Sequence, residues 1–139
     1  MKKVMKLFRK NEKGLTLVEL LAVIVILGII AAIAVPSIGG VIQNSKTNAD
    51  AQSVILIKDA AVRYLTVTNP SGAGATGTPP AVTVTVAQLL TGNYLQDAPQ
   101  VQSSSTTQYY ESVSVEYTGG GWKASTTAPA LTATKPTAS

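Results

Sequence analysis

The chain contains no cysteine and no histidine among its 139 residues. It therefore cannot form disulfide bonds, a thiolate nucleophile or a Cys/His zinc site, and it lacks the imidazole that most often serves in acid–base catalysis. We therefore expect a protein that is not an enzyme and that carries no cofactor.

Other functional signatures are also missing. No glycine-rich run follows a strand pattern and opens a helix with a lysine, so a phosphate-binding loop is not predicted. The later basic residues are scattered among six acids, which does not favour direct DNA binding. Asp97, Glu111 and Glu116 lack the spaced Asp/Asn ligands of a calcium loop, so we expect no metal site.

The net charge of +4 is concentrated at one end of the chain. Residues 1–14 hold six basic residues and one acidic residue, whereas the remainder holds five basic and six acidic residues. Cations that precede a long apolar segment stay on the cytoplasmic side of a membrane. The sequence therefore predicts a basic leader and a topology with the N-terminus inside and the C-terminus outside.

A long apolar segment follows this leader. It begins at Leu15, and from Leu20 to Val35 every residue is apolar or glycine. At ~1.5 Å per residue, the span from Leu15 to Val35 is long enough to cross a hydrocarbon core of ~30 Å. Glu19 is the one acid within it, and a carboxylate costs about 2.5–3.5 kcal/mol at the centre of a bilayer. We therefore expect Glu19 to have a function or a partner.

This region resembles the N-terminal signature of type IV prepilins and of the related pseudopilins of type II secretion and competence systems. The residues that carry the resemblance are Gly14, Leu15, Glu19, Gly28 and Pro36. It covers roughly residues 8–66. Members usually have Phe at the position of Leu15.

The resemblance implies processing and assembly. A prepilin peptidase and N-methyltransferase would cut between Gly14 and Leu15 and methylate Leu15. The freed amine of Leu15 would then pair with Glu19 of a neighbouring subunit in a helical filament. Gly28 and Pro36 would soften the helix, which is often unwound there in filaments of this family.

Further partners and a location follow from the same resemblance. The subunit would lie in the cell membrane before assembly and in a cell-surface filament afterwards, and it would depend on a pilus assembly platform with its ATPase system. Adhesion, motility, secretion and DNA uptake all remain open as roles of the filament.

Other readings of the N-terminal region stay open. Residues 20–33 could form the apolar part of a signal peptide, with cleavage after Ala32-Ile33-Ala34 and a mature chain that starts at Val35. The segment could also be an uncleaved anchor that starts at Met1. Either case would give a secreted or membrane-anchored binding domain. The mature N-terminal residue distinguishes the three possibilities: Leu15 after prepilin processing, Val35 after signal-peptide cleavage, or Met1 in an uncleaved anchor.

The apolar pattern continues beyond Pro36 with spacings of three and four, typical of an amphipathic helix. Its members are Ile38, Val41, Ile42, Ala49, Val54, Ile57, Ala61, Tyr64 and Leu65. We expect one helix of roughly 75 Å, with residues 15–42 in the membrane or the assembly and residues 43–66 leading into a head. Lys58, Asp59 and Arg63 are expected to be solvated or paired at the surface.

Residues 67–139 predict a small β-rich head, which makes the fold class α+β. Asn69–Pro80 reads as a flexible loop, and residues 82–86 as a strand followed by one helical turn. Residues 109–117 and 122–126 predict a hairpin around Gly119-Gly120-Gly121 that docks on the helix. We expect the Thr- and Ala-rich tail from residue 127 to be disordered.

Overall fold

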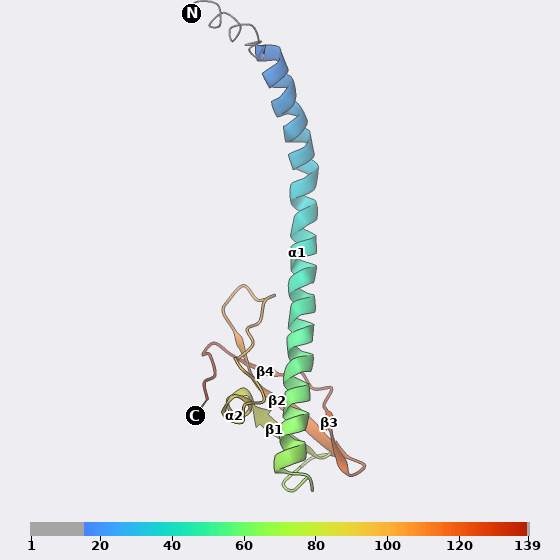
Figure 1. Cartoon of the computed structure of the whole chain (residues 1–139). Helices are drawn as coiled ribbons and strands as arrows, with labels where there is room; N and C mark the ends of the chain where they lie inside the picture. Colours follow the sequence, from blue (N-terminus) through green and yellow to red (C-terminus); the bar gives the residue numbers. More distant parts are fainter. Residues whose placement is uncertain (1–15, 139) are drawn as a thin grey trace, which may run out of the picture. The chain divides into compact units, whose positions relative to one another are not determined.

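A computed structural model describes residues 16–138 of the chain. Two helices and four strands are present there: α1 (Leu17–Thr68), β1 (Ala81–Thr85), α2 (Val86–Thr91), β2 (Tyr109–Thr118), β3 (Gly121–Ala124) and β4 (Ala130–Thr132) (Figure 1). The chain forms two compact units, one that ends at Val41 and one that begins at Ile42. The fold is α+β, as the sequence predicts.

The first unit contains the apolar half of α1. From Leu17 to Val41 no residue is buried. The helix runs through Gly28 and Pro36 without interruption, although proline cannot donate to the carbonyl four residues earlier. Both positions are helical here. The softening of the helix at Gly28 and Pro36 stays a prediction.

In the second unit, α1 covers one face of a small sheet. Ile57, Ala61 and Leu65 are buried, and they share one apolar core with residues of α2 and the sheet. The remaining members of this core are Ala60, Val84, Val86, Leu89, Leu95, Ala98, Val101, Tyr110, Val113, Val115 and Trp122. Burying each Ile, Leu or Val side chain contributes about 1.5–3 kcal/mol, so this core holds the head together.

Only the later part of the predicted apolar face of α1 packs on the core. Val54, Ile57, Ala61, Tyr64 and Leu65 contact the core, whereas Ile38, Val41 and Ile42 are exposed. On the outer side of the helix Ile55 and Leu56 are 52% and 56% exposed. The second half of α1 therefore has an apolar side that packs on the sheet and apolar residues that face away from it.

Strand β2 is the centre of the sheet, and all pairings are antiparallel. Ser112 pairs with Thr85 of β1 and with Ala130 of β4, so these strands lie on opposite edges of β2. Val115 likewise pairs with both β1 and β3. Strands β3 and β4 therefore follow one another along the edge opposite β1.

The predicted hairpin is confirmed as β2 and β3. Gly119 and Gly120 form its two-residue turn with φ angles of 62° and 80°. A type I′ turn needs positive φ at both central positions, which glycine adopts without steric cost. Strand β3 is shorter than expected and ends at Ala124.

The start of α2 is fixed by a capping box, because the Thr85 hydroxyl accepts from the Gln88 N–H while the Gln88 side chain accepts from the Thr85 N–H. This contact also occupies the outer edge of β1. At the other end of β1, Ala81 exchanges two backbone hydrogen bonds with Thr76. Backbone groups along a strand point alternately to its two sides, and those of Thr83 point away from β2. Thr83 is therefore the one residue of β1 whose outward-pointing backbone groups remain open at this edge.

Two segments that the sequence predicts to be irregular are packed. In the segment from Asn69 to Pro80, the Trp122 indole N–H donates to the Asn69 carbonyl at 2.6 Å and the Tyr117 hydroxyl donates to the Pro70 carbonyl. A Cβ on Gly72 would lie 2.5 Å from the Tyr117 ring. The prediction of a flexible loop is therefore wrong for this end of the segment.

The prediction of a disordered tail is also wrong for part of its length. Residues 130–132 form β4 and extend the sheet along Tyr109–Ser112 of β2. The three residues lack the alternation of a typical strand, so only their pairing with a distant strand reveals them.

Candidate functional site

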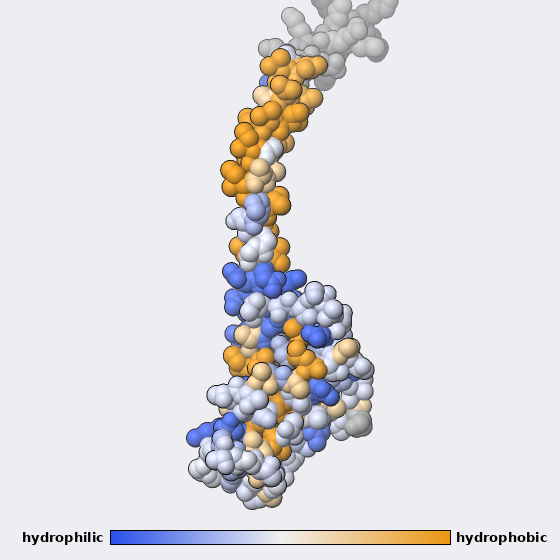
Figure 2. All heavy atoms as spheres, turned by 180° about the vertical axis from the view of Figure 1, so that it is seen from behind, coloured by the Kyte–Doolittle hydropathy of each residue, from blue (hydrophilic) through white to orange (hydrophobic). Residues whose placement is uncertain are grey.

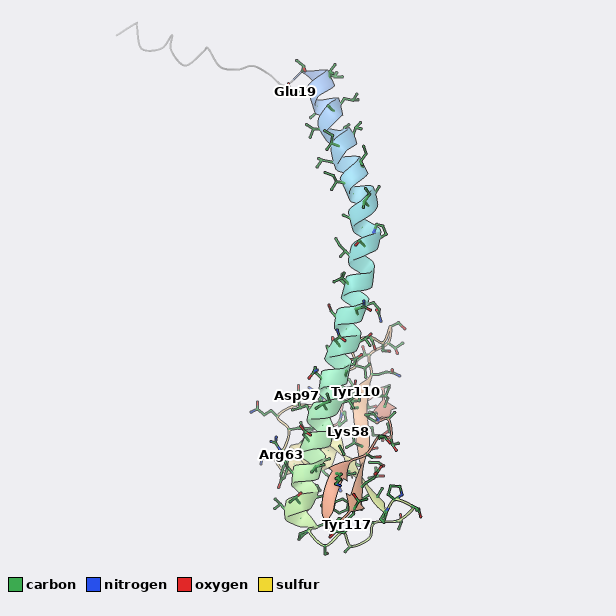
Figure 3. The ribbon with its side chains drawn as sticks, turned by 90° about the vertical axis from the view of Figure 1, so that its right-hand side faces the viewer. Glu19, Lys58, Arg63, Asp97, Tyr110 and Tyr117 are labelled. Carbon is green, nitrogen blue, oxygen red and sulfur yellow. The ribbon has the colours of Figure 1, made fainter. Side chains whose placement is uncertain are left out.

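The N-terminal turn of α1 places Glu19 at the third helical position. Thr16 precedes the helix, and its hydroxyl accepts from the Glu19 N–H at 3.3 Å, while its carbonyl accepts from the N–H groups of Glu19 and Leu20. Thr16 and Glu19 also have the spacing of a capping box. Glu19 is exposed, as the labelled side chain in Figure 3 shows. The carboxylate is thus free to meet another chain.

The rest of this half-helix is an uncovered apolar surface (Figure 2). The Leu, Ile and Val side chains from Leu20 to Ile42 are about half exposed or more. By length and composition, α1 is able to cross a membrane. A water-exposed apolar surface of this extent marks a membrane or protein contact.

Gly14 and Leu15, the predicted cleavage and methylation residues, lie outside the described residues. Gly28 and Pro36 lie within α1, and so do Gly39 and Gly40, which the sequence reading did not single out. A Cβ added at Gly28, Gly39 or Gly40 would meet no atom within 4 Å. Contacts within the chain therefore do not require glycine at these positions.

The sequence reading missed Asp50, which is only 8% exposed. Its two carboxylate oxygens accept from the backbone N–H groups of Gln102 and Ser103 at 2.6 and 2.8 Å. The Tyr110 hydroxyl donates to the Asp50 backbone carbonyl at 3.3 Å. Asp50 is also the first buried residue of α1. This aspartate clamp therefore attaches the loop before β2 to the helix at the point where the helix first meets the head.

Hydrogen bonding sets the charge of Asp50. Burial alone would raise its pKa, but the hydrogen bonds from the Ser103 side chain and from the Gln102 and Ser103 backbone together lower the pKa below its ordinary value. The clamp needs a carboxylate, because a protonated acid accepts less well from two N–H groups. No sequence pattern indicates the aspartate clamp, since the partners of Asp50 lie more than fifty residues further along the chain.

A second polar contact involves Lys58, which the sequence predicts to be solvated or paired at the surface. Its ammonium group donates to the carbonyl of Ser125, so Lys58 is paired, at a partly buried position. The Ser125 hydroxyl donates to Glu116 at 2.6 Å, and Ser125 is itself buried. Lys58 and Tyr110 therefore join α1 to the head at two separate places (Figure 3).

The later acidic residues are separate from one another. Asp97 forms a salt bridge with Lys135 at 2.8 Å, and Glu116 accepts from Ser125. Within residues 16–138 no three acidic side chains gather as a metal-binding group. The exposed apolar half-helix with Glu19 is therefore the candidate functional site.

Comparison with known protein families matches residues 9–35 to the prokaryotic N-terminal methylation motif. No curated protein and no solved structure gives a significant match to the chain. The chain thus carries the hallmark of type IV pilin and prepilin-like proteins, attached to a fold with a long apolar helix and a small antiparallel sheet. The matched segment contains each of the five residues of the predicted signature except Pro36, which follows it directly.

Proposed function

We propose that this protein is the structural subunit of a type IV pilus-like filament. The observation that carries the proposal is the methylation motif over residues 9–35 on a helix that buries nothing between Leu17 and Val41. Such a helix needs either lipid or other helices around it. The proposal covers pilins and the pseudopilins of secretion and competence systems, because the motif is common to both.

In the proposed pathway, the chain is inserted with its basic leader in the cytoplasm and its head outside. A prepilin peptidase removes residues 1–14 and methylates Leu15. An assembly platform with its ATPase then moves the subunit from the membrane into the filament, where it serves a structural and not a catalytic role.

Glu19 has two separable tasks in this proposal. Its backbone helps to start α1 on the Thr16 cap, and its carboxylate pairs with the methylated amine of Leu15 in an adjacent subunit. After cleavage the next cation along the chain is Lys46, far beyond one helical turn. A carboxylate in a helix bundle without a partner is costly, so the pairing fixes the axial position of one helix on the next.

The first experiment determines the mature N-terminus and looks for filaments. Mass spectrometry of protein sheared from the cell surface should show Leu15 as the first residue, one methyl group heavier, and electron microscopy should show filaments. A chain that begins at Val35 or at Met1 would overturn the proposal.

A pair of variants separates the two tasks of Glu19. Glu19→Gln keeps a capping-box side chain at this position and removes the charge, so processed subunit should accumulate normally while filaments are severely reduced. Thr16→Val removes the hydroxyl cap and keeps the charge, so filaments should persist. Normal filaments from Glu19→Gln would show that the carboxylate is not an assembly contact.

A further inference from the structure

Asp59 and Arg63 are two charged residues of α1 that have no partner among the described residues. Both are exposed, and they lie about one helical turn apart in the half of α1 that packs on the sheet (Arg63 is labelled in Figure 3). Within residues 16–138 the one salt bridge joins Lys135 to Asp97, and neither Asp59 nor Arg63 forms a hydrogen bond there. Both side chains are therefore available to another chain.

Two large apolar side chains adjoin this pair of charges on α1. Ile55 and Leu56 precede Asp59 by four and three residues and are 52% and 56% exposed. Residues three and four apart are neighbours on the surface of a helix, so these residues form one continuous surface, which Arg63 extends by a further turn. We term Ile55, Leu56, Asp59 and Arg63 the outer surface of α1. Because it holds one acid and one base, it is complementary in charge to a second copy of itself.

The proposed pairing of Leu15 with Glu19 sets the axial offset between adjacent copies. It shifts one of two parallel helices along the other by four residues, which is about 6 Å at a rise of 1.5 Å per residue. Because α1 is one uninterrupted helix from Leu17 to Thr68, the same offset applies to its later residues. Asp59 of the copy that supplies the Leu15 amine then lies at the level of Arg63 of the copy that supplies Glu19.

This offset is selective among the charges of α1. Its exposed acidic residues are Glu19 and Asp59, and its exposed basic residues are Lys46 and Arg63. Asp59 and Arg63 are the only acid and base of this set that lie four residues apart. Without an offset, Asp59 would meet Asp59 and Arg63 would meet Arg63, and like charges across a contact repel. The charges of the outer surface therefore favour the offset that the pairing of Leu15 with Glu19 requires.

We infer that the outer surface of α1 is a second contact between adjacent copies, in which Asp59 of one copy pairs with Arg63 of the next. This inference rests on the proposed function, because the offset comes from the pairing of Leu15 with Glu19. Arginine suits such a contact, since its guanidinium group can donate two parallel hydrogen bonds to one carboxylate. An ion pair at the surface stabilises little by itself. The contact therefore adjusts the register of copies that the apolar half-helix already holds together.

Charge reversal in the full-length chain tests the contact. Asp59→Arg and Arg63→Asp, each expressed as the only copy of the chain, place like charges at the contact. We expect electron microscopy to show that most filaments are lost, while an immunoblot shows processed subunit at the wild-type amount. Lys123→Glu reverses the charge of an exposed lysine on β3, outside the outer surface, and should leave the number of filaments unchanged.

Co-expression of the two reversed chains distinguishes a contact between copies from one within a chain. When the two chains alternate, every contact between copies again joins an acid to a base, whereas positions 59 and 63 of each single chain still carry like charges. We expect filaments to return and mass spectrometry to find both chains in them in equal amounts. Normal filaments from either reversed chain alone would overturn the inference, and so would a loss of filaments that co-expression does not restore.

The outcomes also separate this inference from the proposed function. If the wild type forms filaments, Glu19→Gln loses them and both charge reversals keep them, the contact between Asp59 and Arg63 is contradicted and the filament is not. If the wild type forms no filaments, the proposed function and this inference are both contradicted.

Discussion

At the scale of single residues, Asp50 fixes the position of one loop of the head. It joins the loop before β2 to α1 through two N–H donors, and it has no cationic partner among the described residues. Burial of a carboxylate is tolerated because both oxygens are satisfied. The aspartate clamp thus depends on charge and geometry together.

We predict that Asp50→Asn destabilises the head by about 1–3 kcal/mol, because the amide leaves one buried N–H group without an acceptor. Trp122 is the one tryptophan of the chain and is buried, so its fluorescence reports unfolding of the full-length protein in detergent. Asp59→Asn, at an exposed position of the same helix, should change the stability by less than about 0.5 kcal/mol. Equal stability of the two variants would contradict the role of the aspartate clamp.

The effect of Asp50→Asn on stability should also depend on pH. Because the folded-state pKa of Asp50 is lowered, its ionised form stabilises the head above the ordinary value of 3.8, and this contribution is lost as the pH falls through the lowered value. The difference in stability between wild type and Asp50→Asn should therefore shrink on acidification. Asp97, whose pKa is lowered by its hydrogen bond from Lys135, is common to both proteins and cancels in the difference.

At the scale of elements, the sequence predicts what local patterns determine. The run of apolar residues predicts the first half of α1. Alternation of apolar and polar residues predicts β1 and β2, and adjacent glycines predict the turn between β2 and β3. It does not predict β4 or the packing of Asn69 and Gly72, because those depend on Tyr109–Ser112, Tyr117 and Trp122 far along the chain. For the same reason the methylation motif is readable from the sequence and the aspartate clamp is not.

Within α1, Gly39 and Gly40 adjoin the boundary between the two units, after Val41. Each glycine in a helix interior costs about 1 kcal/mol relative to alanine, and an added Cβ would meet nothing within 4 Å. We predict that Gly39→Ala with Gly40→Ala slows backbone hydrogen exchange across residues 36–43 of the full-length protein in detergent.

The control for this prediction is the opposite change at an exposed helical position. Ala49→Gly should speed exchange locally and leave residues 36–43 unchanged. Identical exchange in the double variant and the wild type would show that the two glycines do not loosen the helix.

At the scale of the whole molecule, the apolar surface and the folded core occupy different units. The unit from Ile42 onward holds the complete apolar core, while the extended apolar surface belongs to the unit that ends at Val41. The unit from Ile42 onward should therefore fold without the apolar half-helix.

We predict that a chain lacking residues 1–42 is soluble and monomeric, with Trp122 still buried. Ile55 and Leu56 remain exposed on the outer side of α1, but two side chains form too small a patch for stable association. Light scattering measures the mass, and fluorescence measures the burial of Trp122. Polymers of the truncated head would show that α1 before residue 43 is not the assembly element.

The outer edge of β1 affects how heads behave when many of them lie close together. Heads displayed at high density bring sheet edges into repeated contact, and an open edge can template cross-β aggregation between molecules. Here Thr76 and the Gln88 side chain occupy the two ends of that edge, and Thr83 alone remains between them. A single free residue is too short to recruit a foreign strand, so this edge of the sheet is protected against pairing with another head.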